Sequence, residues 1–443
     1  MRTLLDVTAP KVEQLGPRSD EEFVYVDISS IDTERKRIVE PKRLPSNEAP
    51  SRAKQRLKKG DVLVSMTRPN RNAVAIVPAE LDGAIGSTGF HVLRARDGVD
   101  PRWIFNAVQT KSFIASMEDL VQGALYPAVR PKDIQSYSIP VPPLDEQRIA
   151  VAEIEKQFSR LDEAVANLKR VKANLKRYKA AVLKAAVEGH LVPTEADLAR
   201  NECHSFETGG ELLRRVIDSR RKEWKGKFKE PTAPDNAKLS YLPSGWALAS
   251  VDQLAQVGTG ATPNRGRADY FDNGTVPWVT SAVVNERYVD EASEFVTTKA
   301  LAETNLTLYP IGTLVVAMYG EGKTRGKCAE LRVSATTNQA LAALQVDSRV
   351  CRYLRMFLEH NYEETRKVAS GGVQPNLNLS LVRSIVVPLP PLVEQRRIVD
   401  EVERHLSLVR GVEAQVDANL KRAERMRQAV LQTAFAVGSV ARQ

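Results

Sequence analysis

An internal repeat is the feature that most constrains this chain. PVPPLDEQRIAVAEIE at residues 140–155 returns as PLPPLVEQRRIVDEVE at residues 388–403, with ten of sixteen positions identical. The same shift of 248 residues aligns Gly123 with Gly371, Pro127 with Pro375 and Val182 with Val430. A repeat of this length predicts two copies of one structural unit that fill the 443 residues.

A looser match continues upstream of the proline-rich block. LKKGDVLVSM at residues 57–66 resembles LYPIGTLVVAM at 308–318, and VYVDISS at 24–30 resembles PWVTSAV at 277–283. Gly60 then aligns with Gly312, and Met66 with Met318. The register drifts by several residues, which is expected when one scaffold carries two different recognition surfaces in its loops.

Each copy divides into a strand-rich part and a helical part. Short β-like runs such as DVLVSM and FHVLRA, and TLVVAM and ALAALQV in the second copy, predict α+β globular domains. Consecutive prolines then end the extended run, and a helix-favouring sequence follows. We place the globular domains at residues 1–143 and 236–391, a central helix with its connector at 144–235, and a C-terminal helix at 392–443.

Apolar residues in both helical parts recur at alternating steps of three and four. The first stripe contains Val151, Ile154, Phe158, Leu161, Val165 and Leu168, and the second contains Val399, Val402, Leu406, Val409, Val416 and Leu420. This spacing is typical of a coiled-coil seam. We expect two long antiparallel helices that join two globular domains in a pseudo-two-fold repeat. Each helix would be about 60 Å long. Allowing for overlap of the helices and for the width of the domains, the two domains could meet one DNA duplex about one helical turn, roughly 34 Å, apart. Packing of each helix on its own domain is the alternative.

Composition is that of a folded basic protein. Sixty-four Lys and Arg against 55 Asp and Glu give a net charge of +9, which favours polyanionic partners. No run approaches the roughly 18 apolar residues of a membrane span, so we expect a cytoplasmic protein without membrane contact. Three unpaired cysteines and five scattered histidines show neither disulfide nor metal-ligand spacing, and no catalytic triad or methyltransferase tetrapeptide is found.

Loops at corresponding places in the two copies are the candidate DNA-binding elements. Arginine and lysine can neutralise phosphates, and Arg, Asn and Gln can pair with base edges. The candidates are Arg68, Asn70 and Arg71 in TRPNRN, Tyr126 in QGALYPAVR, Tyr319, Lys323, Arg325 and Lys327 in YGEGKTRGK, and Gln374 and Asn376 in SGGVQPNLN. The alternatives are solvated turns and, for the glycine- and proline-containing loops before the proline block, turns that pack the domain onto its helix.

Three further motifs are explained by structural roles. AMYGEGKT nearly matches a nucleotide-binding P-loop, but Ala317 replaces its first glycine and strands, not a helix, are expected to follow. The pairs Glu146–Gln147 and Glu394–Gln395 lie at helix starts, where acidic residues suit the helix dipole; a role in docking a partner remains the alternative. The basic segment 212–229 is interpreted as a connector between the copies, with backbone contact to DNA as the alternative.

In combination these motifs resemble a known family. The doubled PxPPLxEQR block, ANLKRYKAAVLKAAVEGHLVP at residues 173–193 and YLPSGWALASVDQLAQVGTGATP at 241–263 are similar to the specificity subunit of type I restriction-modification enzymes. One departure is that the first domain starts at MRTLLDV, without a counterpart of PSGW, which leaves its first strand in question.

The resemblance implies a division of labour. Each repeat would carry one target recognition domain for half of a bipartite site in double-stranded DNA, with the helices setting the gap. Two methyltransferase subunits using S-adenosylmethionine on adenine, and ATP-dependent restriction subunits, would be partners, so this chain itself would need no cofactor and perform no catalysis. Two rival hypotheses are that the chain is itself a DNA methyltransferase or nuclease, and that it is a coiled-coil adaptor without DNA contact.

Overall fold

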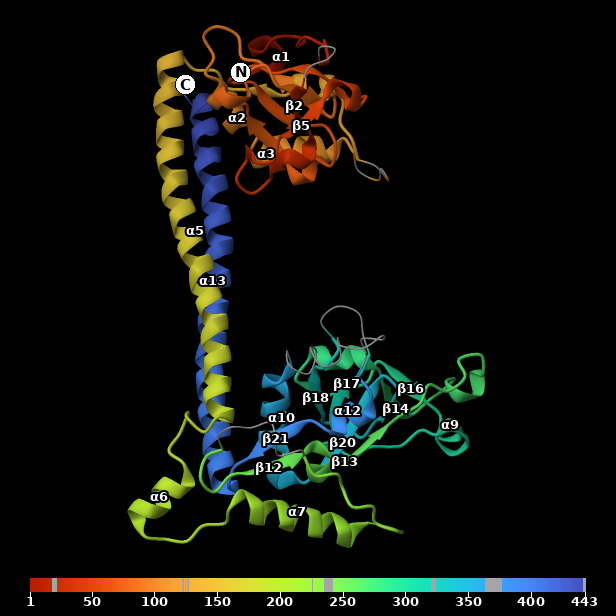
Figure 1. Ribbon diagram of the computed structural model, residues 1–443. Helices are drawn as coiled ribbons and strands as arrows, with labels where there is room; N and C mark the ends of the chain where they lie inside the picture. The colour runs from red at the N-terminus through yellow and green to blue at the C-terminus, as the bar shows by residue number, and fades with distance from the viewer. Residues whose placement is uncertain are drawn as a thin grey trace. The chain divides into compact units, whose positions relative to one another are not determined.

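A computed structural model describes residues 1–17, 22–121, 123, 125, 127–224, 226–234, 242–319, 324–362 and 377–440, with side chains up to residue 436. The chain forms two compact units (Figure 1). Unit 1 comprises residues 1–171 and 415–443, and unit 2 comprises residues 172–414. Tyr126, Lys323, Gln374 and Asn376, four of the predicted DNA-binding residues, lie outside the described residues.

Unit 1 contains a globular α+β part built from short strands. The strands are β1 (Arg2–Thr3), β2 (Glu22–Val26), β3 (Ile31–Asp32), β4 (Arg37–Ile38), β5 (Lys42–Pro45), β6 (Ala53–Arg56), β7 (Val62–Ser65), β8 (Val74–Ile76), β9 (Ile85–Ser87), β10 (Phe90–Leu93) and β11 (Ser138–Ile139). The helices are α1 (Leu4–Val7), α2 (Pro101–Ala107), α3 (Lys111–Asp119) and α4 (Pro131–Gln135). The strands form sheets in the orders β5-β2-β9-β6, β10-β7-β8, β1-β11 and β3-β4.

Unit 2 repeats this plan. Its strands are β12 (Ala247–Ser250), β13 (Ala255–Thr259), β14 (Val276–Val279), β15 (Tyr288–Val289), β16 (Glu294–Val296), β17 (Leu314–Ala317), β18 (Cys328–Leu331), β19 (Thr336–Thr337), β20 (Leu341–Val346) and β21 (Val386–Leu389). Its helices are α6 (Glu195–Glu202), α7 (Gly209–Glu223), α8 (Val251–Leu254), α9 (Thr298–Glu303), α10 (Ser348–His360) and α12 (Leu379–Arg383). The sheet orders are β16-β14-β19, β13-β20-β17-β18-β15 and β12-β21.

The two units share strand pairing and register, which confirms the repeat. In unit 1, β2 lies between antiparallel β5 and parallel β9; in unit 2, β14 lies between antiparallel β16 and parallel β19. The antiparallel arrangement of β10, β7 and β8 likewise corresponds to that of β20, β17 and β18. Gly60 and Gly312, aligned from sequence, have φ angles of 88° and 87° in the turns before β7 and β17.

The central strands are buried on both faces, which explains their continuous apolar sequences. Val62 and Val64 of β7 contribute to one hydrophobic cluster, whereas Leu63 contributes to another. In unit 2, Leu314 and Val316 of β17 face one cluster and Val315 faces a second. Because β7 and β17 are packed on both faces, the position at which the loop after each strand begins is fixed.

The opening of unit 1 corrects one expectation from the sequence. Although no PSGW precedes it, Thr3 caps α1 in a capping box with Asp6, just as Ser250 caps α8 with Gln253. Strand β1 pairs with β11 as β12 pairs with β21, so unit 1 has this first strand in a shorter form. Different residues close the same capping box, which hides the correspondence in the sequence.

Two long helices, α5 (Leu144–Val187) and α13 (Leu392–Val440), follow the proline-rich blocks. In unit 1 the Arg427 guanidinium lies 4.2 Å from the Phe158 ring centroid and pairs with Asp162. Ile154 and Val430 line one groove there, so residue numbers fall on α13 as they rise on α5, and the helices run antiparallel (Figure 1). In unit 2 the Tyr178 hydroxyl lies 2.6 Å from His405 Nδ1.

Candidate nucleic-acid interface

The loop after β7 presents three of the predicted residues on the surface of unit 1. Pro69 to Arg71 form a 3-10 turn, η3, directly after the buried strand. Arg68, Asn70 and Arg71 are exposed, and their side chains have no hydrogen bond or ion pair with another described residue. The loop therefore exposes two guanidinium groups and one carboxamide. These are groups that can contact phosphates or base edges.

Hydrogen bonds to residues far away in the sequence hold this loop at both ends. The Arg68 backbone N–H donates to the Pro127 carbonyl at 2.9 Å, which joins the loop to the segment before the proline block. At the other end, buried Asn72 donates from Nδ2 to the Val108 carbonyl at 2.8 Å. Arg68 and Asn72 both have positive φ, of 50° and 43°, and such backbone strain persists only when surrounding contacts fix it.

Lys36 is a contact to this loop that no sequence pattern indicated. Its Nζ donates to the Asn72 carbonyl at 2.6 Å and to Asn72 Oδ1 at 3.1 Å. Burial, assisted by the nearby Arg427 charge, lowers the pKa of Lys36 to about 8. A side chain 36 residues away in the sequence therefore helps to fix the end of the loop that follows Arg71.

The corresponding loop of unit 2 lies between β17 and β18. Tyr319 is 39% exposed at its start, and the Lys327 ammonium donates to Asn285 Oδ1 at 2.9 Å at its end. Arg325 is half-buried, and its Nε has no partner among the described residues. Here too the loop meets the segment before the proline block, because the Leu377 N–H donates to the Met318 carbonyl at 3.1 Å.

The two loops share their anchors but not their exposed side chains. In unit 1 the Val129 N–H donates to the Met66 carbonyl, as Leu377 does to Met318, and these pairs correspond between the copies. Beyond the anchors, unit 1 exposes Arg and Asn on a short turn, whereas unit 2 presents Tyr and basic residues on a longer connection. Equal frameworks with different polar side chains suit the recognition of two different surfaces.

The nucleotide-binding alternative does not fit the described part of this loop. Residues 320–323 lie outside it, but the chain continues from Lys327 into strand β18, not into a helix. A P-loop requires a helix N-terminus facing the phosphates. Among the described residues, no group of three His, Cys, Asp or Glu side chains is placed to hold a metal, and no helix is long and apolar enough to cross a membrane.

The predicted seam residues of α5 and α13 are all at least half-buried, and Val151, Val399, Val402 and Leu406 belong to hydrophobic clusters that include residues of the globular parts. Buried members are Val151, Ile154, Val399, Val402, Leu406, Val409 and Val416, and half-buried members are Phe158, Leu161, Val165, Leu168 and Leu420. The helix-start pairs differ from expectation in two respects. Glu394 is fully buried and accepts hydrogen bonds from the Trp246 indole N–H and the Glu195 backbone N–H. Gln147 and Gln395 are buried and donate to the Pro142 and Pro390 carbonyls, which ties each proline block to its helix.

Comparison with known proteins identifies related chains. The family described as type I restriction modification DNA specificity domain matches residues 32–177 and 243–421. The type I restriction enzyme MjaIX specificity subunit of Methanocaldococcus jannaschii is 27% identical over 181 residues, covering 40% of each chain. The HindI specificity subunit of Haemophilus influenzae is 21% identical over 394 residues, covering 81% of this chain and 84% of that one.

Solved structures share the fold across nearly the whole chain. A chain from a solved structure of a type I restriction-modification system aligns with a TM-score of 0.74 and 24% identity. The alignment covers 98% of this chain and 96% of that chain. The HsdS subunit from Thermoanaerobacter tengcongensis aligns with a TM-score of 0.55 at 24% identity, covering 98% of this chain and 95% of that one.

Proposed function

Because the chain belongs to the family of type I restriction modification DNA specificity domains, we propose that it is the DNA-recognition subunit of a type I restriction-modification complex. In this function each unit reads one half of a bipartite target in double-stranded DNA. The observation that carries the proposal is the pair of anchored loops after β7 and β17, which occupy the same place in each unit and display different polar side chains.

The loop residues take distinct roles in this proposal. Arg68 and Arg71 contact guanine edges or phosphates, and Asn70 pairs with adenine, as the geometry of these side chains favours. In unit 2, Tyr319, Arg325 and Lys327 contact the other half-site. Tyr126, Lys323, Gln374 and Asn376 complete the proposed contact set. The recognition domains correspond to residues 1–143 and 236–391.

In this proposal the partner subunits catalyse the reactions. Two methyltransferase subunits, which use S-adenosylmethionine to modify adenine N6, and ATP-dependent restriction subunits act where this chain places them. The chain supplies binding, orientation and sequence discrimination, with no catalytic residue and no cofactor of its own. Because its target is DNA, the proposed location is the cytoplasm.

Mapping of N6-methyladenine tests the assignment. A host strain carrying the partner methyltransferase is compared with and without this gene, and with Arg68, Asn70 and Arg71 together replaced by alanine. We expect one bipartite motif with a fixed gap to disappear without the gene and to lose or relax one half in the triple variant. Unchanged methylation, together with no DNA binding by the purified complex, would favour the adaptor hypothesis.

A further inference from the structure

The loop after β7 ends at Asn72, whose backbone is strained. Asn72 is 7% exposed and has a φ of 43°, a conformation that residues other than glycine seldom adopt. It lies two residues before β8, and Gly326, with a φ of 86°, lies two residues before β18 in unit 2. Glycine adopts such a conformation without strain. An asparagine at this place in unit 1 therefore points to a role for its side chain.

The Asn72 side chain is hydrogen-bonded to a buried corner between two helices. Its Nδ2 donates to the carbonyl of Val108, the C-cap of α2. Two residues later, Thr110 caps the start of α3, and its hydroxyl donates back to the Ala107 carbonyl at 2.7 Å. Residues 108–110, here called the corner, are all buried. Because both helix ends are closed by hydrogen bonds, the corner is a fixed support for Asn72.

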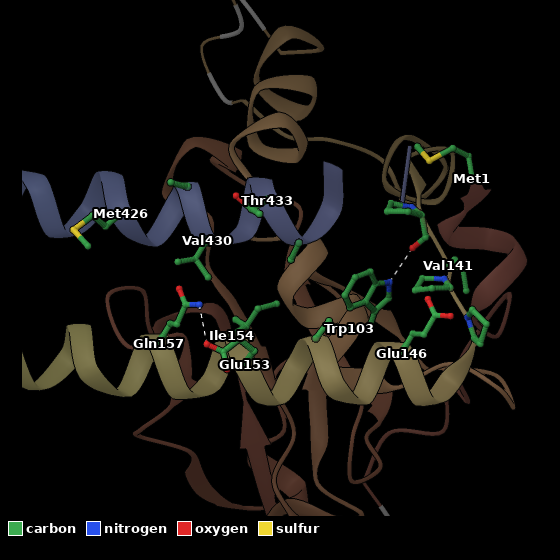
Figure 2. Close-up of a pocket in the computed structure, with 16 residues that line it drawn as sticks. Met1, Trp103, Val141, Glu146, Glu153, Ile154, Gln157, Met426, Val430 and Thr433 are labelled. Atoms are coloured by element: carbon green, nitrogen blue, oxygen red, sulfur yellow. Dashed lines mark hydrogen bonds between the residues drawn. The ribbon is translucent and has the colours of Figure 1, made fainter. Parts of the chain in front are cut away.

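The end of α13 holds the same corner from its other side. Gln428 Nε2 donates to the Gln109 carbonyl at 3.1 Å, and Gln109 directly follows the residue that Asn72 binds. Met426 and Val430 project from α13 toward α5 (Figure 2). Successive helical residues turn by about 100°, so Gln428, two residues from each, lies on the opposite side of α13. The loop after β7 and α13 are thus hydrogen-bonded to adjacent carbonyls of one corner.

Unit 2 has neither side-chain donor of this connection. The 248-residue shift places Ala180 at the position of Gln428, and Gly326 stands where unit 1 has Asn72. Neither residue has a side chain that can donate a hydrogen bond. The loop after β17 is instead held at its end by Lys327, which donates to Asn285 Oδ1. The connection of a loop to a long helix through these two positions is therefore a feature of unit 1.

We propose that Gln428 is a positioning residue for DNA recognition by unit 1, because its hydrogen bond from α13 fixes the corner that holds Asn72. Arg71 directly precedes Asn72, so a displacement of the corner displaces an exposed guanidinium. Contacts of a binding site must be held to within about 0.5 Å of their working geometry. The inference rests on the proposed function and adds that reading of the unit 1 half-site depends on the end of α13.

Gln428→Met in the full chain separates positioning from stability. Methionine keeps the length of the side chain but cannot donate, and it removes Gln428 Oε1, a buried atom without a partner among the described residues. We expect a melting temperature within about 2 °C of the wild type or above it. Discrimination between the target and DNA with a scrambled unit 1 half-site should nevertheless fall by about threefold to tenfold, the effect of one hydrogen bond. Fluorescence anisotropy measures this ratio.

Two further variants test the route through the corner. Gln432→Met, which changes an exposed glutamine one turn along α13, is the matched control and should alter discrimination by less than about 1.5-fold. Asn72→Gly removes the side chain but suits the positive φ, and we expect it to lower discrimination at the unit 1 half-site by about tenfold. Adding Gln428→Met to Asn72→Gly should cause little further loss, because both residues act through one corner.

Each result supports or overturns the proposal. Unchanged discrimination in Gln428→Met overturns it, and the proposed function still stands if the triple alanine variant of Arg68, Asn70 and Arg71 loses discrimination at the unit 1 half-site. No loss in that triple variant contradicts the proposed function itself. An equal loss at the unit 2 half-site, a loss matched by Gln432→Met, or additive losses in the double variant would also overturn the positioning role of Gln428.

Discussion

At the residue scale, Arg71 offers the most direct test of DNA contact. Its guanidinium is exposed on a loop whose backbone is fixed from both sides, so removing the side chain should leave the fold intact. Arg71→Ala is expected to weaken target binding by about 1–3 kcal/mol if it contacts a base, or to reduce the salt slope by about one if it contacts a phosphate. Fluorescence anisotropy at several salt concentrations measures both.

Arg148→Ala provides the matched control for this substitution. Arg148 is an exposed arginine on α5 of the same unit, and its ion pair is with Asp145, 3.6 Å away. Equal losses of target-binding free energy for Arg71→Ala and Arg148→Ala would mean that only the overall positive charge of the unit contributes to binding. The proposed specific contact by the loop would then be wrong.

His91 on β10 makes unit 1 sensitive to acid. Burial lowers the pKa of His91 to about 4 from 6.5, and its Nε2 has no partner among the described residues. The unfolded chain therefore binds more protons than the folded chain between these values. Stability is fully present above pH 6.5 and falls by up to about 3 kcal/mol as pH decreases through 4.

Thermal melts of the wild-type chain and of His91→Phe, at pH 7 and pH 5, test this dependence. The substitution should reduce the difference between the two melting temperatures, whereas the same change at exposed His190 should not. An unchanged difference in His91→Phe would show that other groups dominate the acid response.

The candidate site was only partly predictable from sequence. The pattern located the loops after β7 and β17, because glycine, proline and strand-like runs mark where a chain must turn. It gave no sign of Lys36, whose bond to Asn72 depends on tertiary folding, and none that Lys327 would hold Asn285. Contacts between residues far apart in sequence leave no local pattern.

At the element scale, the helix seam provides a matched pair of leucines. Leu406 of α13 is 7% exposed and belongs to the core of unit 2, whereas Leu408, two residues along the same helix, is 59% exposed. Leu406→Ala should lower the free energy of unfolding by about 2–5 kcal/mol through lost burial and a cavity, and Leu408→Ala by about 0.5 kcal/mol or less. Urea denaturation followed by circular dichroism compares them, and similar losses would contradict the assigned helix faces.

The elements themselves were largely predictable. The proline blocks and the steps of three and four residues predicted long helices after residues 143 and 391, and the structure has α5 and α13 there. Alignment of VYVDISS with PWVTSAV predicted the correspondence of Val26 and Val279, which pair with Gly86 and Thr337 in the two parallel ladders. The capping box of Thr3 was missed, because Thr–Asp and Ser–Gln perform one task with no shared identity.

At the scale of the whole molecule, two units with separate cores should recognise two half-sites independently. Asn70→Ala in unit 1 and Tyr319→Ala in unit 2 change exposed side chains that share no partner among the described residues. Each variant should lose discrimination at one half of the target and retain it at the other. Their losses in binding free energy on the intact target should add to within about 0.5 kcal/mol.

Binding of each variant, and of the double variant, to the intact target and to two DNAs with one half-site scrambled measures this independence. The unit 1 variant should bind the DNA scrambled in its own half-site as well as the wild type does, because the contact it lacks is already absent there. Loss of discrimination at the same half by both variants would mean that the units do not divide the target. Strong non-additivity on the intact DNA would instead indicate that binding by one unit depends on the other, since independent contacts contribute additively.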